Sequence, residues 1–140
     1  MTLDQVETLI KASFEQMRAR YNGNSVFDEW AVISLADNRA RVLVYSGPRK
    51  EGFKQNFAAD SAALRTALLA GEHPVGDFEF NRQGTGTGFE AFMRLSPDLY
   101  LICNNTVQSM DAIAANPSWI QAQVPFVDLS ERVRVDPVTA

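Results

Sequence analysis

The fold is decided by the stretch Leu99-Tyr100-Leu101-Ile102-Cys103, which is apolar at nearly every position. The turn-forming triplet Ser96-Pro97-Asp98 stands directly before it. A run that is apolar throughout is typical of a strand buried on both faces of its sheet. Both faces of the predicted sheet must therefore be covered, either by helices or by a second copy of the protein.

Two segments before that turn alternate between apolar and polar residues. In residues 89–95 every second residue from Phe89 onward is apolar, and in residues 77–82 the apolar positions are Phe78 and Phe80. Strict alternation predicts strands with one face toward a core, and it fixes their register. Together with residues 99–103, these segments predict an antiparallel meander of three strands.

The amino-terminal part of the chain predicts one helix followed by one hairpin. Apolar residues recur at steps of three and four up to about residue 20, and Thr2 with Gln5 matches a capping box. The apolar face of this helix comprises Leu3, Val6, Ile10, Phe14, Met17 and Tyr21. Residues 30–36 and 41–45 are rich in strand-forming residues and flank a turn at 37–39, which predicts a hairpin.

The other segments are predicted to be helical, apart from one ambiguous stretch. Residues 53–59 fit either a short strand or the first turns of a helix, and residues 61–70 fit a helix. Residues 107–115 also fit a helix, and Pro125 must kink or divide the helical stripe that follows. That stripe comprises Trp119, Ile120, Val124 and Val127. Residues 136–140 are expected to form a loose tail.

These elements predict a single α+β domain that spans residues 1–140. Its central antiparallel sheet is expected to have five to six strands, with helices on both sides. A chain of 140 residues is near the commonest domain size and buries roughly two-thirds of its unfolded surface. It therefore needs neither a metal nor a disulfide to fold.

Charge and composition argue against several classes of function. The net charge of −4 disfavours binding to nucleic acid or to anionic lipid, because both require a basic surface. No apolar run approaches the roughly 20 residues of a membrane helix, and the acidic start lacks the pattern of a signal peptide. These features predict a cytoplasmic protein that binds neither nucleic acid nor membranes.

The motifs that could carry chemistry are weak. The glycine-rich residues 84–88 precede a strand, so no helix amino terminus would face a bound phosphate, and a hairpin loop is the better interpretation. His73 is the only histidine and has no ligand partners at zinc-site spacing. Cys103, the only cysteine, lies in an apolar strand and is expected to be a small core residue. We therefore predict no metal, no cofactor and no catalytic residue.

Two groups of charged residues remain as candidates. Arg49 and Lys50 lie in a Gly/Pro loop of an acidic protein and could contact an anion or a partner carboxylate, although a solvated turn is the better explanation. Asp77, Glu79 and Glu90 could share one face of the meander. A pair of carboxylates can perform acid–base chemistry, but such residues more often form a solvated sheet face.

The order of the elements resembles that of the Roadblock / dynein light-chain family, which has a profilin-like fold. The matching pieces are the leading helix, the hairpin of residues 30–36 and 41–45, and the meander that ends at residues 99–103. The resemblance implies an α-β-β-α-β-β-β-α sandwich without catalytic residues. It also implies homodimers that pair sheets or helices and that bind small Ras-like GTPases or support larger assemblies.

The sequence thus favours a non-catalytic, cytosolic regulatory or scaffolding protein that dimerises and binds a protein partner, for which a small Ras-like GTPase is one candidate. An alternative is a profilin-like or PAS-like sensor of a small ligand. Its pocket would be lined by Phe78, Phe80, Phe92 and Trp119. A hydrolase or isomerase that uses the sheet carboxylates is the third and weakest interpretation.

Overall fold

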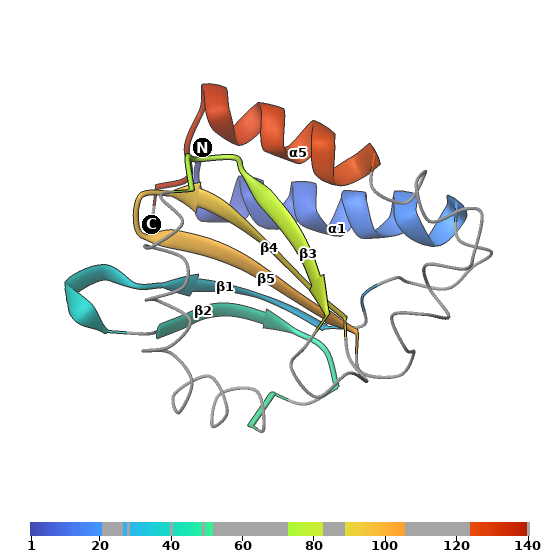
Figure 1. Ribbon diagram of the computed structural model, residues 1–140, viewed down its shortest axis with the longest axis horizontal. Coiled ribbons are helices and arrows are strands. Elements are labelled where there is room, and N and C mark those ends of the chain that lie inside the picture. Colours follow the sequence, from blue (N-terminus) through green and yellow to red (C-terminus); the bar gives the residue numbers. More distant parts are fainter. Residues whose placement is uncertain are drawn as a thin grey trace.

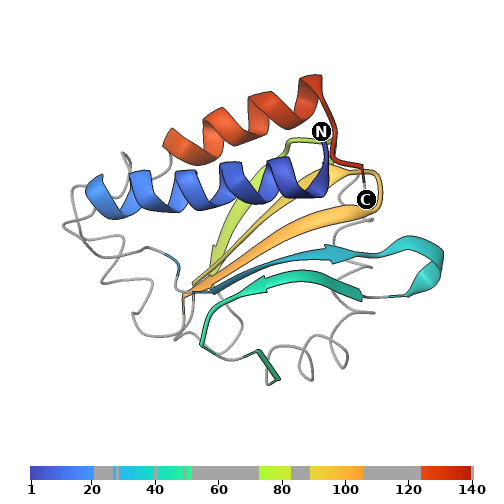
Figure 2. The same cartoon turned by 180° about the vertical axis from the view of Figure 1, so that it is seen from behind.

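The protein has an α+β fold with two helices packed on one antiparallel sheet (Figures 1 and 2). This computed structural model describes residues 1–20, 27, 29–39, 41–48, 50–51, 73–82, 89–105 and 124–139. The predicted fold class and the central antiparallel sheet are confirmed.

Five strands in the order β2-β1-β5-β4-β3 form the sheet, and every neighbouring pair is antiparallel. The strands are β1 (Glu29–Ser34), β2 (Arg41–Ser46), β3 (Phe78–Arg82), β4 (Phe89–Ser96) and β5 (Leu99–Asn105). The apolar stretch at 99–103 lies in the central strand β5, which explains why it has no polar face. The predicted hairpin and the predicted meander are both confirmed.

Helix α1 (Leu3–Arg20) begins with the predicted capping box. The Thr2 backbone N–H donates to Oε1 of Gln5 at 2.9 Å, and the Gln5 N–H donates to Oγ1 of Thr2 at 3.2 Å. Val6, Ile10 and Phe14 are buried, as their spacing predicts. These contacts fix both the start of the helix and the face that it turns toward the sheet.

Helix α5 (Val124–Val135) corrects one prediction for the carboxy-terminal part. Pro125 lies in the first turn of this helix, where its missing N–H leaves no hydrogen bond unmade, so α5 itself is not kinked. Because residues 106–123 lie outside the described residues, a helical stripe divided at Pro125 stays a prediction. Val127 was predicted to belong to the apolar stripe but is 42% exposed. The buried face of α5 is instead formed by Phe126, Leu129 and Val133, which are three and four residues apart and so lie on one side of the helix.

The segment predicted to be a loose tail is anchored to the rest of the protein. Val138 is 3% exposed in the core, and its N–H donates to the carbonyl of Leu95 at 3.1 Å. Thr139 forms a parallel bridge with Thr2, and its N–H donates to the carbonyl of Met1 at 2.8 Å. The single buried valine and the backbone pairing explain the order of this tail, and neither leaves a periodic signal in so short a segment.

Both described helices cover the same face of the sheet, which we call the helix face (Figures 1 and 2). Its core holds sixteen buried residues, all of them apolar. At its centre the Phe126 ring lies 5.7 Å from Phe27, 6.1 Å from Phe78 and 6.4 Å from Phe14, measured between ring centroids. Cys103 belongs to this core, which confirms its prediction as a core residue.

The opposite face of the sheet, which we call the second face, is also buried. It carries a separate core of six residues: Ala31, Ile33, Leu35, Phe92, Tyr100 and Ile102. The predicted burial of β5 on both faces is therefore confirmed. The segments predicted at 53–59, 61–70, 84–88 and 107–115 lie outside the described residues, so the prediction of helices on both sides stays a prediction.

Candidate functional site

Strand β3 is one edge of the described sheet, and its register shows which backbone groups face outward. The Arg94 N–H donates to the carbonyl of Asp77 at 3.1 Å, and the Arg94 carbonyl accepts from the N–H of Gly76 at 2.7 Å. Backbone groups alternate in direction along an antiparallel strand. The residues two and four positions before Arg94 therefore also point their backbone groups toward β3, where their register partners are Glu79 and Asn81.

The other residues of β3 consequently present their N–H and C=O groups to the outer edge. These are Phe78, Phe80 and Arg82, three hydrogen-bonding positions spaced evenly along five residues. Charge is distributed unevenly along the same strand, with Asp77 and Glu79 near its start and Arg82 at its end. The edge of a sheet is the usual place where a further antiparallel strand pairs with it.

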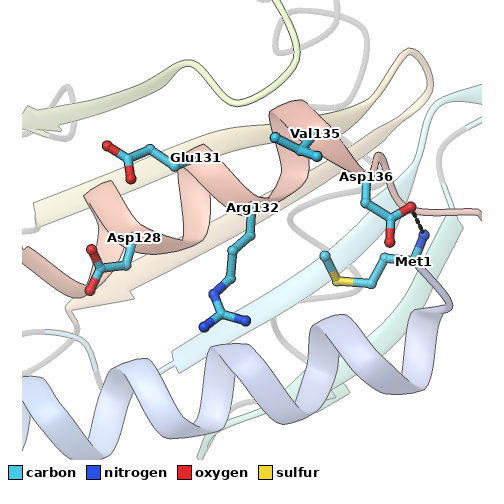
Figure 3. A pocket seen from close by; sticks show the side chains of 6 residues that line it. All are labelled: Met1, Asp128, Glu131, Arg132, Val135 and Asp136. Atoms are coloured by element: carbon cyan, nitrogen blue, oxygen red, sulfur yellow. Dashed lines mark hydrogen bonds and ion pairs between the residues drawn. The ribbon is translucent and has the colours of Figure 1, made fainter.

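The outer surface of the two helices carries a shallow hollow of about 660 Å³ (Figure 3). Its lining residues are Met1, Asp128, Glu131, Arg132, Val135 and Asp136. The Met1 amine lies 2.6 Å from Oδ1 of Asp136. Arg132 extends toward α1, whereas the carboxylates of Asp128 and Glu131 point away from α1. A smaller hollow of about 80 Å³ continues between Ser13 of α1 and Leu129 of α5.

A polar cluster lies on the second face at one end of β1. Glu29 is completely buried, and the Tyr45 hydroxyl donates to its Oε2 at 2.5 Å. Gly47 packs directly against this pair, because a Cβ there would lie 2.9 Å from both Cγ of Glu29 and Oη of Tyr45. The two side chains are thus hydrogen-bonded to each other beside the apolar core of the second face.

The register extends this cluster into a row of polar residues across the sheet. Glu29 pairs with Asn104, Asn104 pairs with Glu90, and Glu90 pairs with Asn81. We call Glu29, Asn104, Glu90 and Asn81 the polar row. Glu29 was not among the candidate residues predicted from the sequence. One signal was present, because Glu29 is two residues before Ala31 and four before Ile33, and alternation along a strand places all three on the same face.

Arg94 is a structural link rather than an anion site. Its guanidinium donates to the carbonyls of His73 and Pro97, each at 2.7 Å, and lies 5.7 Å from the centroid of the Tyr100 ring. His73 packs edge-on against Phe92, with ring centroids 5.4 Å apart. Within the described ranges no group of three or more His, Cys, Asp or Glu side chains is placed to hold a metal ion.

The predicted ligand pocket is not assembled as expected. Phe78 contacts the helix-face core, whereas Phe92 belongs to the core of the second face, so the sheet separates the two rings. Trp119 and the side chain of Phe80 lie outside what the structure describes. Phe78 and Phe92 therefore cannot line one pocket, because their side chains lie on opposite faces of the sheet.

The structure also separates the candidate charged residues. Lys50 is exposed beyond the end of β2, and Arg49 is outside the described residues. Asp77 forms an ion pair with Arg134 of α5 at 3.0 Å, Glu79 is in register with Phe92, and Glu90 is in register with Asn81. Asp77 is thus engaged with a helix, and only Glu79 and Glu90 remain as neighbours on adjacent strands.

A second basic feature lies at the turn of the hairpin. Ala36, Asp37, Arg39 and Arg41 line a hollow of about 420 Å³. Asp37 has a φ of 56°, a left-handed conformation that aspartate tolerates better than most residues. Arg39 and Arg41 are exposed, so the basic character expected near Arg49 and Lys50 extends to both ends of β2.

No protein-family model matches the chain, and no curated protein matches it. Neither described helix is long and apolar enough to cross a membrane.

Proposed function

We propose that the protein is a non-catalytic regulatory or scaffolding protein that forms a homodimer and binds a protein partner. The observation that carries this proposal is the edge of β3. Its outward-facing backbone positions are symmetric about Phe80, and its charges run from acidic to basic. An isologous dimer requires a surface that is complementary to itself, and this edge meets that requirement.

The geometry of such a dimer follows from the register. Two β3 strands related by a two-fold axis at Phe80 would run antiparallel and would join the two sheets into one. Each Phe78 would then lie opposite Arg82 of the second copy. In the same register each Glu79 would lie opposite Asn81 of the second copy, and Phe80 would lie opposite itself.

Sedimentation analysis over a range of concentrations tests the dimer. We expect a particle of twice the 15.5 kDa chain mass. Arg82→Pro removes an outward N–H and should give monomers, whereas Arg82→Ala keeps that N–H and should only weaken the dimer. A wild-type protein that stays monomeric at every concentration would refute the proposal.

A charge variant makes the test specific for this edge. Arg82→Glu would leave three acidic residues, at positions 77, 79 and 82, along the edge of each copy, and it should weaken the dimer. Arg39→Glu makes the same change in net charge at an exposed position outside β3 and should leave the dimer intact. If both variants weaken the dimer equally, the dimer does not use the proposed edge of β3.

The candidate partner, a small Ras-like GTPase, comes from the resemblance in element order. Affinity purification of the tagged protein from its own host, followed by mass spectrometry, tests it. Enrichment of a GTPase over an untagged control would support this partner. Recovery of the protein alone would count against a GTPase while leaving the sedimentation result to decide on the dimer.

The polar row favours one alternative, a sensor of a small polar ligand on the second face. Glu29, which is buried and paired with Tyr45, would then fix one end of the polar row and would not itself contact the ligand. A thermal-shift screen against small metabolites tests it, since a ligand that binds only the folded state raises the melting temperature. A shift that persists unchanged in Glu29→Gln would exclude the polar row as the site.

A further inference from the structure

The described part of the chain exposes only two large apolar side chains, and both are on α5. Val127 is 42% exposed and Val135 is 88% exposed. They are eight residues apart, which is about 12 Å along a helix axis and close to the same side of it. The opposite side of α5 packs on the sheet through Phe126, Leu129 and Val133, so these two valines contribute nothing to the core.

Helix formation does not explain valine at these positions. A β-branched side chain loses rotamer freedom in a helix, and a solvent-exposed position would favour alanine, lysine or glutamate. Two exposed valines on one side of a single helix are therefore better explained by a contact with another molecule. This inference rests on the proposed role as a protein-binding scaffold.

Charge on the same side of α5 indicates the chemistry of that molecule. Asp128 and Glu131 lie between the valines, both are exposed, and neither forms an ion pair with any described residue. The other charged side chains nearby either form ion pairs within the protein or point toward α1. Asp136 binds the Met1 amine, Arg134 binds Asp77, and Arg132 extends toward α1 (Figure 3).

We propose that this surface, the α5 ridge of Val127, Asp128, Glu131 and Val135, docks an amphipathic helix from a protein partner. The docking face of that helix combines aliphatic side chains with lysine or arginine. Two helices pack with their axes about 8–10 Å apart, which brings aliphatic anchors at helical spacing onto the two valines. Basic side chains flanking those anchors pair with Asp128 and Glu131 and set the orientation.

Fluorescence anisotropy with two synthetic peptides tests the ridge. One is a labelled Leu/Lys peptide patterned as an amphipathic helix, and the other is a matched Leu/Glu peptide. We expect only the Leu/Lys peptide to bind, with an affinity that falls as salt screens the carboxylates. Equal binding of both peptides, or no binding of the Leu/Lys peptide, would overturn the proposal.

Matched charge variants localise the binding. Asp128→Lys with Glu131→Lys should weaken the Leu/Lys peptide about tenfold or more. Glu51→Lys with Asp98→Lys makes the same change in net charge at exposed positions elsewhere and should leave the affinity within about twofold. Equal losses in the two double variants would show binding to overall charge and would refute the ridge.

A valine variant separates this inference from the proposed dimer. Val127→Ser with Val135→Ser should weaken peptide binding about tenfold, while sedimentation still reports the wild-type mass. If this variant becomes monomeric, a second copy covers the ridge and the partner helix is refuted. Peptide binding that survives in monomeric Arg82→Pro would support the ridge independently of the β3 dimer.

Discussion

The two faces of the sheet are built on different principles. The helix-face core contains sixteen buried residues in the described part of the chain, and none carries a charge. The second face has six buried apolar residues and, beside them, the buried carboxylate of Glu29 with its hydroxyl donor Tyr45. The core of one face is apolar throughout, with the buried Ser130–Gly76 hydrogen bond beside it, whereas the other face has a buried carboxylate next to its core.

This difference indicates how each face can respond to change. A close-packed apolar core tolerates little loss of volume, because neighbours relax only partly into a cavity. A buried polar pair depends instead on the continued presence of both partners, because an unpaired group costs its full desolvation penalty. Variants that remove volume from the apolar core and variants that remove one partner of the polar pair therefore lower stability for different reasons.

Phe126→Ala should have the largest effect. Phe126 is 1% exposed and contacts three other rings, so its removal leaves a cavity at the centre of the helix face. We expect a loss of about 3–5 kcal/mol in the free energy of unfolding, measured by urea denaturation. Val127→Ala, one residue along the same helix but exposed, is the control and should change stability by less than about 0.5 kcal/mol.

Gly76→Ala should come next, because it tests the attachment of α5 to the edge of the sheet. Gly76 has a φ of 91°, and an added Cβ would lie 2.8 Å from the carbonyl oxygen of Ser130. The Ser130 hydroxyl also donates to the Gly76 carbonyl. We expect a loss of about 2–3 kcal/mol by thermal or urea unfolding.

A second variant separates the causes of that loss. The new Cβ would also overlap Cγ of Arg134, but that side chain can move. Combining Gly76→Ala with Arg134→Ala should therefore recover only a small part of the stability. Full recovery would show that the side-chain contact, and not the backbone, sets the requirement for glycine.

The helix face could be predicted largely from the sequence, and the second face could not. Periodicity at Val6, Ile10 and Phe14, and alternation around Met93, report directly on burial against an apolar layer. Alternation with Ala31 and Ile33 gives the face on which Glu29 lies, but hydrophobic patterns assign a carboxylate to solvent and therefore do not predict its complete burial. Its burial depends on Tyr45, sixteen residues away, and pairing over that distance is set by the register of β1 and β2.

The edges of the sheet show the same limit. Alternation predicted β3 as a strand, but its place at the edge and its outward-facing positions required the order β2-β1-β5-β4-β3. Likewise, the α5 ridge was hidden by the expectation that Val127 belongs to an inner stripe. The buried positions of α5 are Phe126, Leu129 and Val133, and Val127, one residue after Phe126, is turned about 100° away from it.

Tyr45→Phe tests the second face and should have an intermediate effect. It keeps the ring but removes the hydroxyl that donates to Glu29. We expect a loss of about 1–2 kcal/mol in unfolding free energy, since a buried oxygen loses its donor. In a double-mutant cycle with Glu29→Gln, the two losses should not add. Additive losses would mean that the pair does not act as a unit and would weaken the contrast between the faces.

Asp77→Asn should have the smallest effect, because it removes an ion pair at the surface. Arg134 and Asp77 are 3.0 Å apart, but their side chains are 50% and 39% exposed. Solvent screens such a pair, so we expect a loss of about 0.2–0.5 kcal/mol by urea denaturation at low salt. The loss should disappear at about 1 M salt, where the screening length is only about 3 Å. A loss above about 1 kcal/mol, or one that persists at high salt, would show that charge stabilises the helix face. In that case the two faces would differ in the number of their polar contacts and not in the principle that holds them.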